Sequence, residues 1–168
     1  PVLIGSYAND SLRGSASFLN GHVDGQLARA FMLGRYPAQP DDAMVFLNAI
    51  PTGKPGGAIV VGLGPVGELL PGKLTQALAN GLLEYARSHE QRQCADSAGA
   101  ERLAVSALLV GTGFTGLTIE VGARCLLDAL RRANESLGRA GMKARIGRLT
   151  LYEEAEDRAI VTAQVLRD

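Results

Sequence analysis

The sequence is poor in the residues that build metal centres, disulfide frameworks and catalytic triads. Its two cysteines, Cys94 in a polar stretch and Cys125 in a helical pattern, match neither a metal-ligand spacing nor a disulfide framework. Its two histidines, His22 and His89, do not stand near a serine or cysteine in a recognised catalytic context. The sequence therefore predicts no metal site, no catalytic residue and no cofactor, and the unpaired cysteines indicate a reducing compartment, the cytoplasm.

The chain also lacks an excess of charge and a long apolar run. Seventeen basic residues balance seventeen acidic ones, so no net field attracts a polyanion such as duplex nucleic acid. No stretch approaches the roughly eighteen consecutive apolar residues of a membrane span, and the first residues lack the basic flank of a secretory signal. We therefore expect neither nucleic acid nor a membrane among the partners.

What remains has the composition of an ordinary globular protein. Hydrophobic residues make up 46% and charged residues 20% of the 168 positions, which suits one domain with a continuous core over residues 1–168. The chain begins with Pro1 and not with methionine. We therefore expect a module excised from a longer multidomain protein, with the neighbouring domains of that protein as partners.

The most informative feature is a phrase that occurs twice: an apolar run, then Gly-x-Gly-x-x-Gly, then an amphipathic segment. The first copy contains Gly62, Gly64 and Gly67, and the second contains Gly111, Gly113 and Gly116. A strand that ends in glycines before a helix directs backbone N–H groups at one place beside the positive end of the helix, which suits an anion. The same pattern also forms tight turns that serve folding alone. A dinucleotide site would need an acid on the next strand, and neither copy has one there.

Apolar periodicity predicts strands and helices in alternation. Strands are predicted at 2–4, 43–47, 58–61, 105–110 and 145–152, and helices at 16–32, 71–87, 118–138 and 153–166. Residues 88–101 are polar without a period and indicate a helix end followed by a surface loop. The alternation predicts an α/β fold whose mixed, mostly parallel sheet carries helices on both faces. Ligands of such sheets bind beyond the carboxyl ends of the strands, so two neighbouring glycine-ended strands would rim one crevice.

The second loop offers side chains as well as amides. Thr112 and Thr115 carry hydroxyls that suit a phosphate, and the ring of Phe114 suits a base or a ribose. Turn formation, with Phe114 in the core, is the alternative interpretation.

Two segments resemble macro domains, which bind ADP-ribose. The stretch from Leu108 through the second glycine motif to Leu130 resembles their phosphate loop and the helix after it. Tyr7-Ala8-Asn9-Asp10 resembles their ribose loop, and this resemblance implies that Asn9 contacts the ribose. The chain departs from that family at residues 15–20, where glycines would be expected beside the diphosphate.

A further resemblance covers the first glycine motif. Ile59 to Gly64 followed by Leu70 to Ala77 resembles the N-terminal macro-like domain of leucine aminopeptidases, whose metals and catalytic groups belong to the other domain. A similar segment, matching from Val2 to Leu166, occurs in large bacterial proteins with a caspase-like CHAT domain.

Together the resemblances imply a non-catalytic macro-like module that binds a nucleotide-like or other anionic ligand of the ADP-ribose type. Two alternatives stay open: a structural or protein-interaction domain without a ligand, and a hydrolase of ADP-ribose conjugates with Asn9 and Asp24 near the distal ribose. The expected ligand-binding residues are Asn9, Gly62, Gly64, Gly67, Gly111, Thr112, Gly113, Phe114, Thr115 and Gly116.

Overall fold

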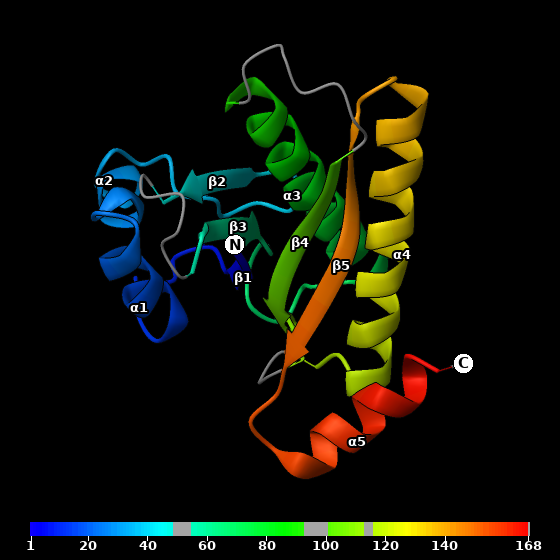
Figure 1. The fold of residues 1–168 in the computed structure, drawn as a ribbon. Helices are drawn as coiled ribbons and strands as arrows, with labels where there is room; N and C mark the ends of the chain where they lie inside the picture. Colours follow the sequence, from blue (N-terminus) through cyan, green and yellow to red (C-terminus); the bar gives the residue numbers. More distant parts are fainter. Residues whose placement is uncertain (49–54, 93–100, 113–115, 168) are drawn as a thin grey trace.

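The computed structural model describes residues 1–48, 55–92, 101–112 and 116–167, and strands alternate with helices along the chain (Figure 1). In chain order the elements are β1 (Val2–Ser6), α1 (Ser15–His22), α2 (Gln26–Met32), β2 (Ala43–Leu47), β3 (Gly57–Gly62), α3 (Pro71–Arg92), β4 (Glu101–Leu108), α4 (Ile119–Arg139), β5 (Ala144–Tyr152) and α5 (Glu156–Val165). No helix in the described ranges is both long and apolar enough to cross a membrane.

The strands form one sheet in the order β2-β3-β1-β4-β5. β1 is parallel to β3 and β4, β4 is parallel to β5, and β2 alone runs antiparallel, along β3. The predicted mixed, mostly parallel α/β fold is thus confirmed. The two glycine-ended strands, β3 and β4, are not neighbours, because β1 lies between them. Since all three are parallel, the loops that follow them still leave the sheet at the same edge.

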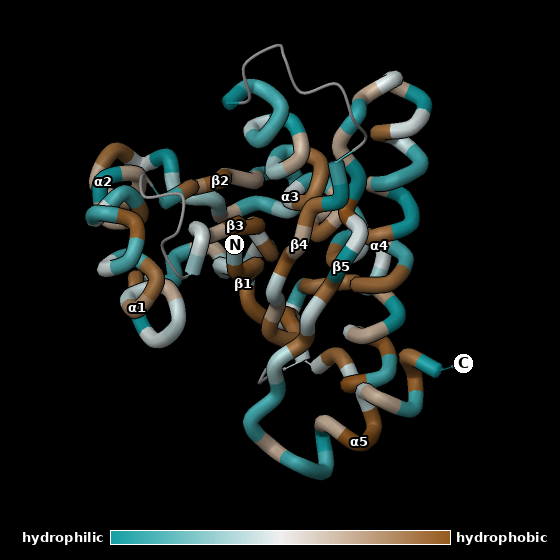
Figure 2. The backbone as a smooth tube through the Cα atoms, viewed as in Figure 1, coloured by the Kyte–Doolittle hydropathy of each residue, from teal (hydrophilic) through white to brown (hydrophobic). Residues whose placement is uncertain are grey.

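Helices cover the two faces of the sheet, each over its own core (Figure 1). Alternating residues of β1 and β3 point to opposite faces: Leu3, Ile59 and Val61 pack in the core under α3 and α4, while Ile4 and Val60 pack in the core under α1 and α2. All six residues of β3 are buried, as expected for a parallel strand covered on both sides. Figure 2 shows that apolar and polar residues alternate along α4, as expected for a helix with one buried face.

The coverage is incomplete at β4. Leu103, Val105 and Ala107 of this strand are buried against the helices, whereas Arg102 and Ala104 on its other face are exposed. α1 and α2 lie over the β1 and β3 side of the sheet and leave this face of β4 uncovered among the described residues (Figure 1). Helices on both faces, as predicted, therefore hold for the β1 and β3 part of the sheet.

The predicted helix over 16–32 is divided into α1 and α2. Asp24 and Gly25 both adopt left-handed backbone angles, with φ of 53° and 72°, which end one helix and start another. The Asn20 side chain then accepts a hydrogen bond from the Ala28 N–H at 2.9 Å and so stabilises the start of α2. Gly21 and Gly25 lie within the predicted helix, and glycine destabilises a helix interior, but their presence does not locate the break.

α3 extends to Arg92, about one turn past its predicted end. The Glu90 carboxylate in this polar turn accepts hydrogen bonds from the backbone N–H groups of Lys143 and Ala144, at 2.6 and 2.8 Å. A contact with residues more than fifty positions away thus stabilises a turn whose local sequence has no apolar period. The helix end predicted at residue 87 therefore lies about one turn too early, while residues 93–100 of the predicted loop lie outside the described residues.

Candidate functional site

Three loops meet at the carboxyl edge of the sheet, after β1, β3 and β4. Gly5 of β1 makes their approach possible, because a Cβ atom there would lie 2.5 Å from Leu63 Cδ1 and 2.6 Å from Val110 Cγ1. The β1 loop is joined to the β3 loop directly, since the Ala8 N–H donates to the Gly64 carbonyl at 2.9 Å. Sequence reasoning missed Gly5, although an isolated glycine in a strand signals a close approach of this kind.

The first glycine loop directs its leading amides into the protein. The N–H groups of Gly62, Leu63 and Gly64 donate to the carbonyls of Asp42, Ser6 and Ala38 at 2.8 to 2.9 Å. These amides are committed to the fold and do not face a ligand in this conformation. Pro65 has no N–H, which leaves the amides of Val66 and Gly67, for which the described part of the chain supplies no acceptor.

Each glycine of this loop has its own reason to lack a side chain. A Cβ atom on Gly62 would lie 2.0 Å from the Gln39 carbonyl oxygen, so this glycine admits the backbone of residues 38–42. Gly64 and Gly67 adopt φ angles of +77° and +87°, a region that L side chains enter only at a cost. Gly67 has no other atom near its Cβ position, so its backbone faces open space.

The second glycine loop touches the segment that follows the first. Gly111, with φ of +80°, leaves room for Leu69 and Leu74, whose Cδ2 atoms would lie 2.9 and 3.2 Å from a Cβ atom at this position. Gly116 also has a left-handed φ, of +95°, and open space beside it. The two loops therefore flank one site, on either side of the loop after β1. Gly113, Phe114 and Thr115, which the sequence places in the ligand site, lie outside the described residues.

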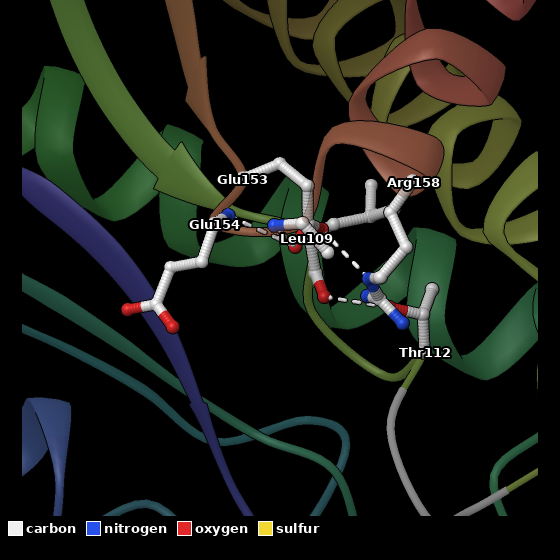
Figure 3. Close-up of polar contacts among 6 residues, drawn as sticks. Leu109, Thr112, Glu153, Glu154 and Arg158 are labelled. Atoms are coloured by element: carbon white, nitrogen blue, oxygen red, sulfur yellow. Dashed lines mark hydrogen bonds and ion pairs between the residues drawn. The ribbon is translucent and has the colours of Figure 1, made fainter.

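Thr112 joins the second loop to the C-terminal helix (Figure 3). Its Oγ1 hydroxyl donates to the Leu109 carbonyl at 3.0 Å and accepts from Arg158 Nη2 at 2.9 Å. The Arg158 Nε atom in turn lies 3.1 Å from a carboxylate oxygen of Glu153. The hydroxyl proton is thus already committed, and the group that Thr112 can offer to an anion is its backbone N–H. No local pattern indicates this link, because Arg158 lies 46 positions away.

The N-terminus of α4 adjoins the second loop and already carries negative charge. Thr118 caps the helix, with its Oγ1 accepting from the Val121 N–H at 3.3 Å. Glu120 lies in the first turn, and a hydrogen bond from its own backbone N–H, followed by that of the Thr118 hydroxyl, lowers the pKa of its carboxyl group. An anionic ligand would therefore meet this carboxylate as well as the positive end of the helix.

Asn9 lies at the tip of the loop after β1. It is exposed, and its φ of 64° is a left-handed angle that asparagine tolerates better than most residues. It lines one end of a cavity of about 340 Å³ that continues toward the segment after α2. The structure thus brings Asn9 to the same edge as both glycine loops.

The histidines and the described cysteine have local partners. His22 Nδ1 lies 3.0 Å from the Phe18 carbonyl oxygen, and His89 Nε2 lies 2.8 Å from a Glu101 carboxylate oxygen. The buried Cys125 thiol lies 3.3 Å from the Pro71 carbonyl oxygen, while Cys94 lies outside the described residues. Within the described ranges no three His, Cys, Asp or Glu side chains gather in a way that could hold a metal ion.

Comparison with solved structures identifies the architecture. A Trypanosoma brucei macrodomain in complex with ADP superposes with a TM-score of 0.65 at 14% sequence identity, over 98% of this chain and 62% of that one. An Oceanobacillus iheyensis macrodomain with ADP superposes with a TM-score of 0.57 at 15% identity, over 98% of this chain and 82% of that one. The fold is that of the macrodomains. The predicted macro-like fold is therefore confirmed.

This chain spans less than two thirds of the length of the Trypanosoma brucei macrodomain. That macrodomain was also solved in complex with ADP-ribose. This second structure superposes with a TM-score of 0.62 at 15% identity, over 98% of this chain and 62% of that one. No protein-family model and no curated protein matches the chain.

Proposed function

We propose that this macro-like domain binds a nucleoside diphosphate of the ADP-ribose type at the carboxyl edge of the sheet, without catalysing a reaction of it. The observation that carries the proposal is the convergence of three loops at one edge, with both glycine motifs beside the loop of Asn9. The amides of Val66, Gly67 and Thr112 are placed there without an acceptor in the described part of the chain. Solved proteins of the same fold hold ADP and ADP-ribose, which supports this ligand class.

Calorimetric titration with ADP-ribose tests the proposal. We expect saturable heat with ADP-ribose and ADP, and much weaker heat with adenosine, because the amides and the helix end recognise the diphosphate. The absence of heat at millimolar ADP-ribose would contradict the proposal.

A matched pair of variants at Gly67 tests whether the first loop is part of the site. Both Gly67→Asn and Gly67→Asp enter open space, and both residues tolerate a left-handed backbone. The two side chains have nearly the same shape, so the aspartate adds only a negative charge. We expect the asparagine variant to keep most of the affinity for ADP-ribose and the aspartate variant to lose about tenfold, more at low salt than at high salt. Equal affinities would place the diphosphate away from this loop.

A protein-interaction role has one observation in its favour. Val66 and Leu70, on either side of the end of the first glycine motif, expose 63% and 59% of their surface. Apolar side chains at the rim of a site suit a protein partner better than a nucleotide. The resemblance to modules of bacterial CHAT proteins and of leucine aminopeptidases fits this role, and we propose it as the alternative. Leu70→Ser should then abolish capture of the partner and leave the heat of ADP-ribose titration unchanged.

A further inference from the structure

The cavity beside Asn9 has a lining unlike that of the glycine loops. It lies between the loop after β1 and the segment that follows α2, and its volume is about 340 Å³. The residues that line it include three of the eight aromatic residues of the chain, Tyr7, Phe31 and Tyr36, together with Asp10. Because aromatic residues make up only 5% of the sequence, their collection around one cavity is a specific feature of this surface.

The two rings contributed by the α2 side are held against each other. Phe31 and Tyr36 form an edge-to-face pair with ring centroids 6.0 Å apart, and Phe31 remains 44% exposed. An edge-to-face pair leaves a ring face available to a third group, and the face of an aromatic ring carries partial negative charge. Such a face attracts a cation that comes within about 6 Å of its centre.

Asp10 supplies full negative charge at the same cavity. One of its carboxylate oxygens accepts a hydrogen bond from the Ser11 N–H at 2.9 Å. No lysine, arginine or histidine lies within ion-pair distance of it in the described part of the chain. The nearby Arg35 lines the adjacent cavity, with Asp41 and Asp42, and does not line this one. The charge of Asp10 is therefore left for a group from outside.

Tyr36 adds no charge of its own at neutral pH. Burial, and then the negative charge of Asp10, raise the pKa of the Tyr36 phenol to about 12. The phenol thus stays neutral, and its hydroxyl oxygen is buried without a hydrogen-bond partner among the described residues. The cavity consequently combines neutral rings with one carboxylate.

We propose that this cavity is a binding site for an organic cation, a guanidinium or alkylammonium group placed between the aromatic rings and Asp10. The cavity adjoins the proposed nucleotide site at Asn9, but the cation is held by other residues, the rings and Asp10. The cation can come from a free small molecule or from an arginine side chain of a peptide, because both present the same group.

Titration of the isotope-labelled protein, followed by amide NMR signals, tests the proposal. The probes are N-acetylarginine amide and its neutral counterpart N-acetylcitrulline amide, at constant ionic strength. We expect the arginine compound to shift the signals of Asn9, Asp10 and Gly34, and the citrulline compound to leave them unchanged. A Gly-Gly-Arg-Gly-Gly peptide distinguishes the two sources: tighter binding than the arginine compound indicates a peptide side chain, and equal binding indicates a free cation.

Two variants and a control connect the binding to this cavity. Asp10→Asn removes the charge but keeps an oxygen for the Ser11 N–H, so the fold is preserved, and we expect about fivefold weaker binding. Phe31→Leu should weaken binding to a similar extent. Asp41→Asn removes a carboxylate from the adjacent cavity and should change nothing. Equal shifts by the citrulline compound, or unchanged affinity of the Asp10 variant, would overturn the proposal, and neither outcome depends on ADP-ribose binding.

Discussion

Gly62 offers a sharp test of what the first glycine motif does, because it has an assigned structural role and a matched control. Adding a Cβ atom by Gly62→Ala places that atom 2.0 Å from the Gln39 carbonyl oxygen and 2.6 Å from the Gln39 nitrogen. Both are backbone atoms, so no side chain can rotate away, and the segment of residues 38–42 has to move by about 1 Å to reach ordinary contact. This movement breaks the hydrogen bonds from Gly62 to Asp42 and from Gly64 to Ala38.

The size of the effect follows from these contacts. Forcing a side chain into a packed site costs about 1–3 kcal/mol, and each lost hydrogen bond costs about 1 kcal/mol. We therefore expect Gly62→Ala to lower the free energy of unfolding by about 3–5 kcal/mol, a large share of the roughly 5–15 kcal/mol of a typical domain.

Urea unfolding followed by circular dichroism measures this free energy. The control is Gly21→Ala in α1, where no atom lies within 4 Å of the Cβ position and the residue is exposed. The same chemical change should there raise stability by about 0.5–1 kcal/mol, because alanine favours a helix over glycine. A loss of less than about 1 kcal/mol for Gly62→Ala would refute the packing argument and return the Gly62 amide to the list of candidate ligand donors.

Three further predictions concern single side chains. Thr112→Val keeps the methyl group but leaves the Arg158 guanidinium and a carbonyl without their partner, so thermal unfolding should show a loss of about 1–2 kcal/mol. Tyr36→Phe removes a buried hydroxyl to which the described part of the chain offers no partner, and it should be neutral or slightly stabilising. The pKa of Tyr36 is about 12 in the folded protein and about 10 in the unfolded chain. The free energy of unfolding of the parent protein should therefore fall as the pH rises from about 10 to about 12, and that of the variant should fall less. Unfolding measured across this pH range checks the difference. Glu120→Gln should tighten ADP-ribose binding in calorimetry at low salt, while Glu135→Gln near the other end of α4 should not.

The arrangement of strands and helices was largely predictable from the sequence because the local apolar pattern indicates most of the elements. The β2 strand over 43–47 was predicted at its observed position, since it depends on residues adjacent in the chain. The misplaced end of α3 depends on a distant partner. The last turn of α3 is stabilised by Glu90 reaching the start of β5, and no local pattern records that contact.

The candidate site divides in the same way. Glycine motifs after buried strands correctly predicted where the loops leave the sheet, because parallel strands share a carboxyl edge. Which N–H groups face a ligand was not predictable from the sequence. The Gly62 and Gly64 amides donate to carbonyls of residues 38–42, and this segment lies beside them because the following strand, β2, pairs antiparallel with β3. The hydrogen bond that the Thr112 hydroxyl accepts likewise comes from a distant residue, Arg158 of α5, with α4 and β5 between them in the chain.

The backbone N–H groups that remain unused restrict the position of an anion more closely than the repeated motif does. The leading half of the first loop uses its amides internally, so only its far end, at Val66 and Gly67, can reach a ligand. In the second loop Thr112 lies against Gly122 near the start of α4, where Glu120 already holds a negative charge. Under the proposed function, a diphosphate would therefore lie between the amides of Val66 and Gly67 and the amide of Thr112, with one phosphate near each loop. Among the described residues the two copies of the motif would then contribute unequally, because the first copy uses its leading amides within the fold.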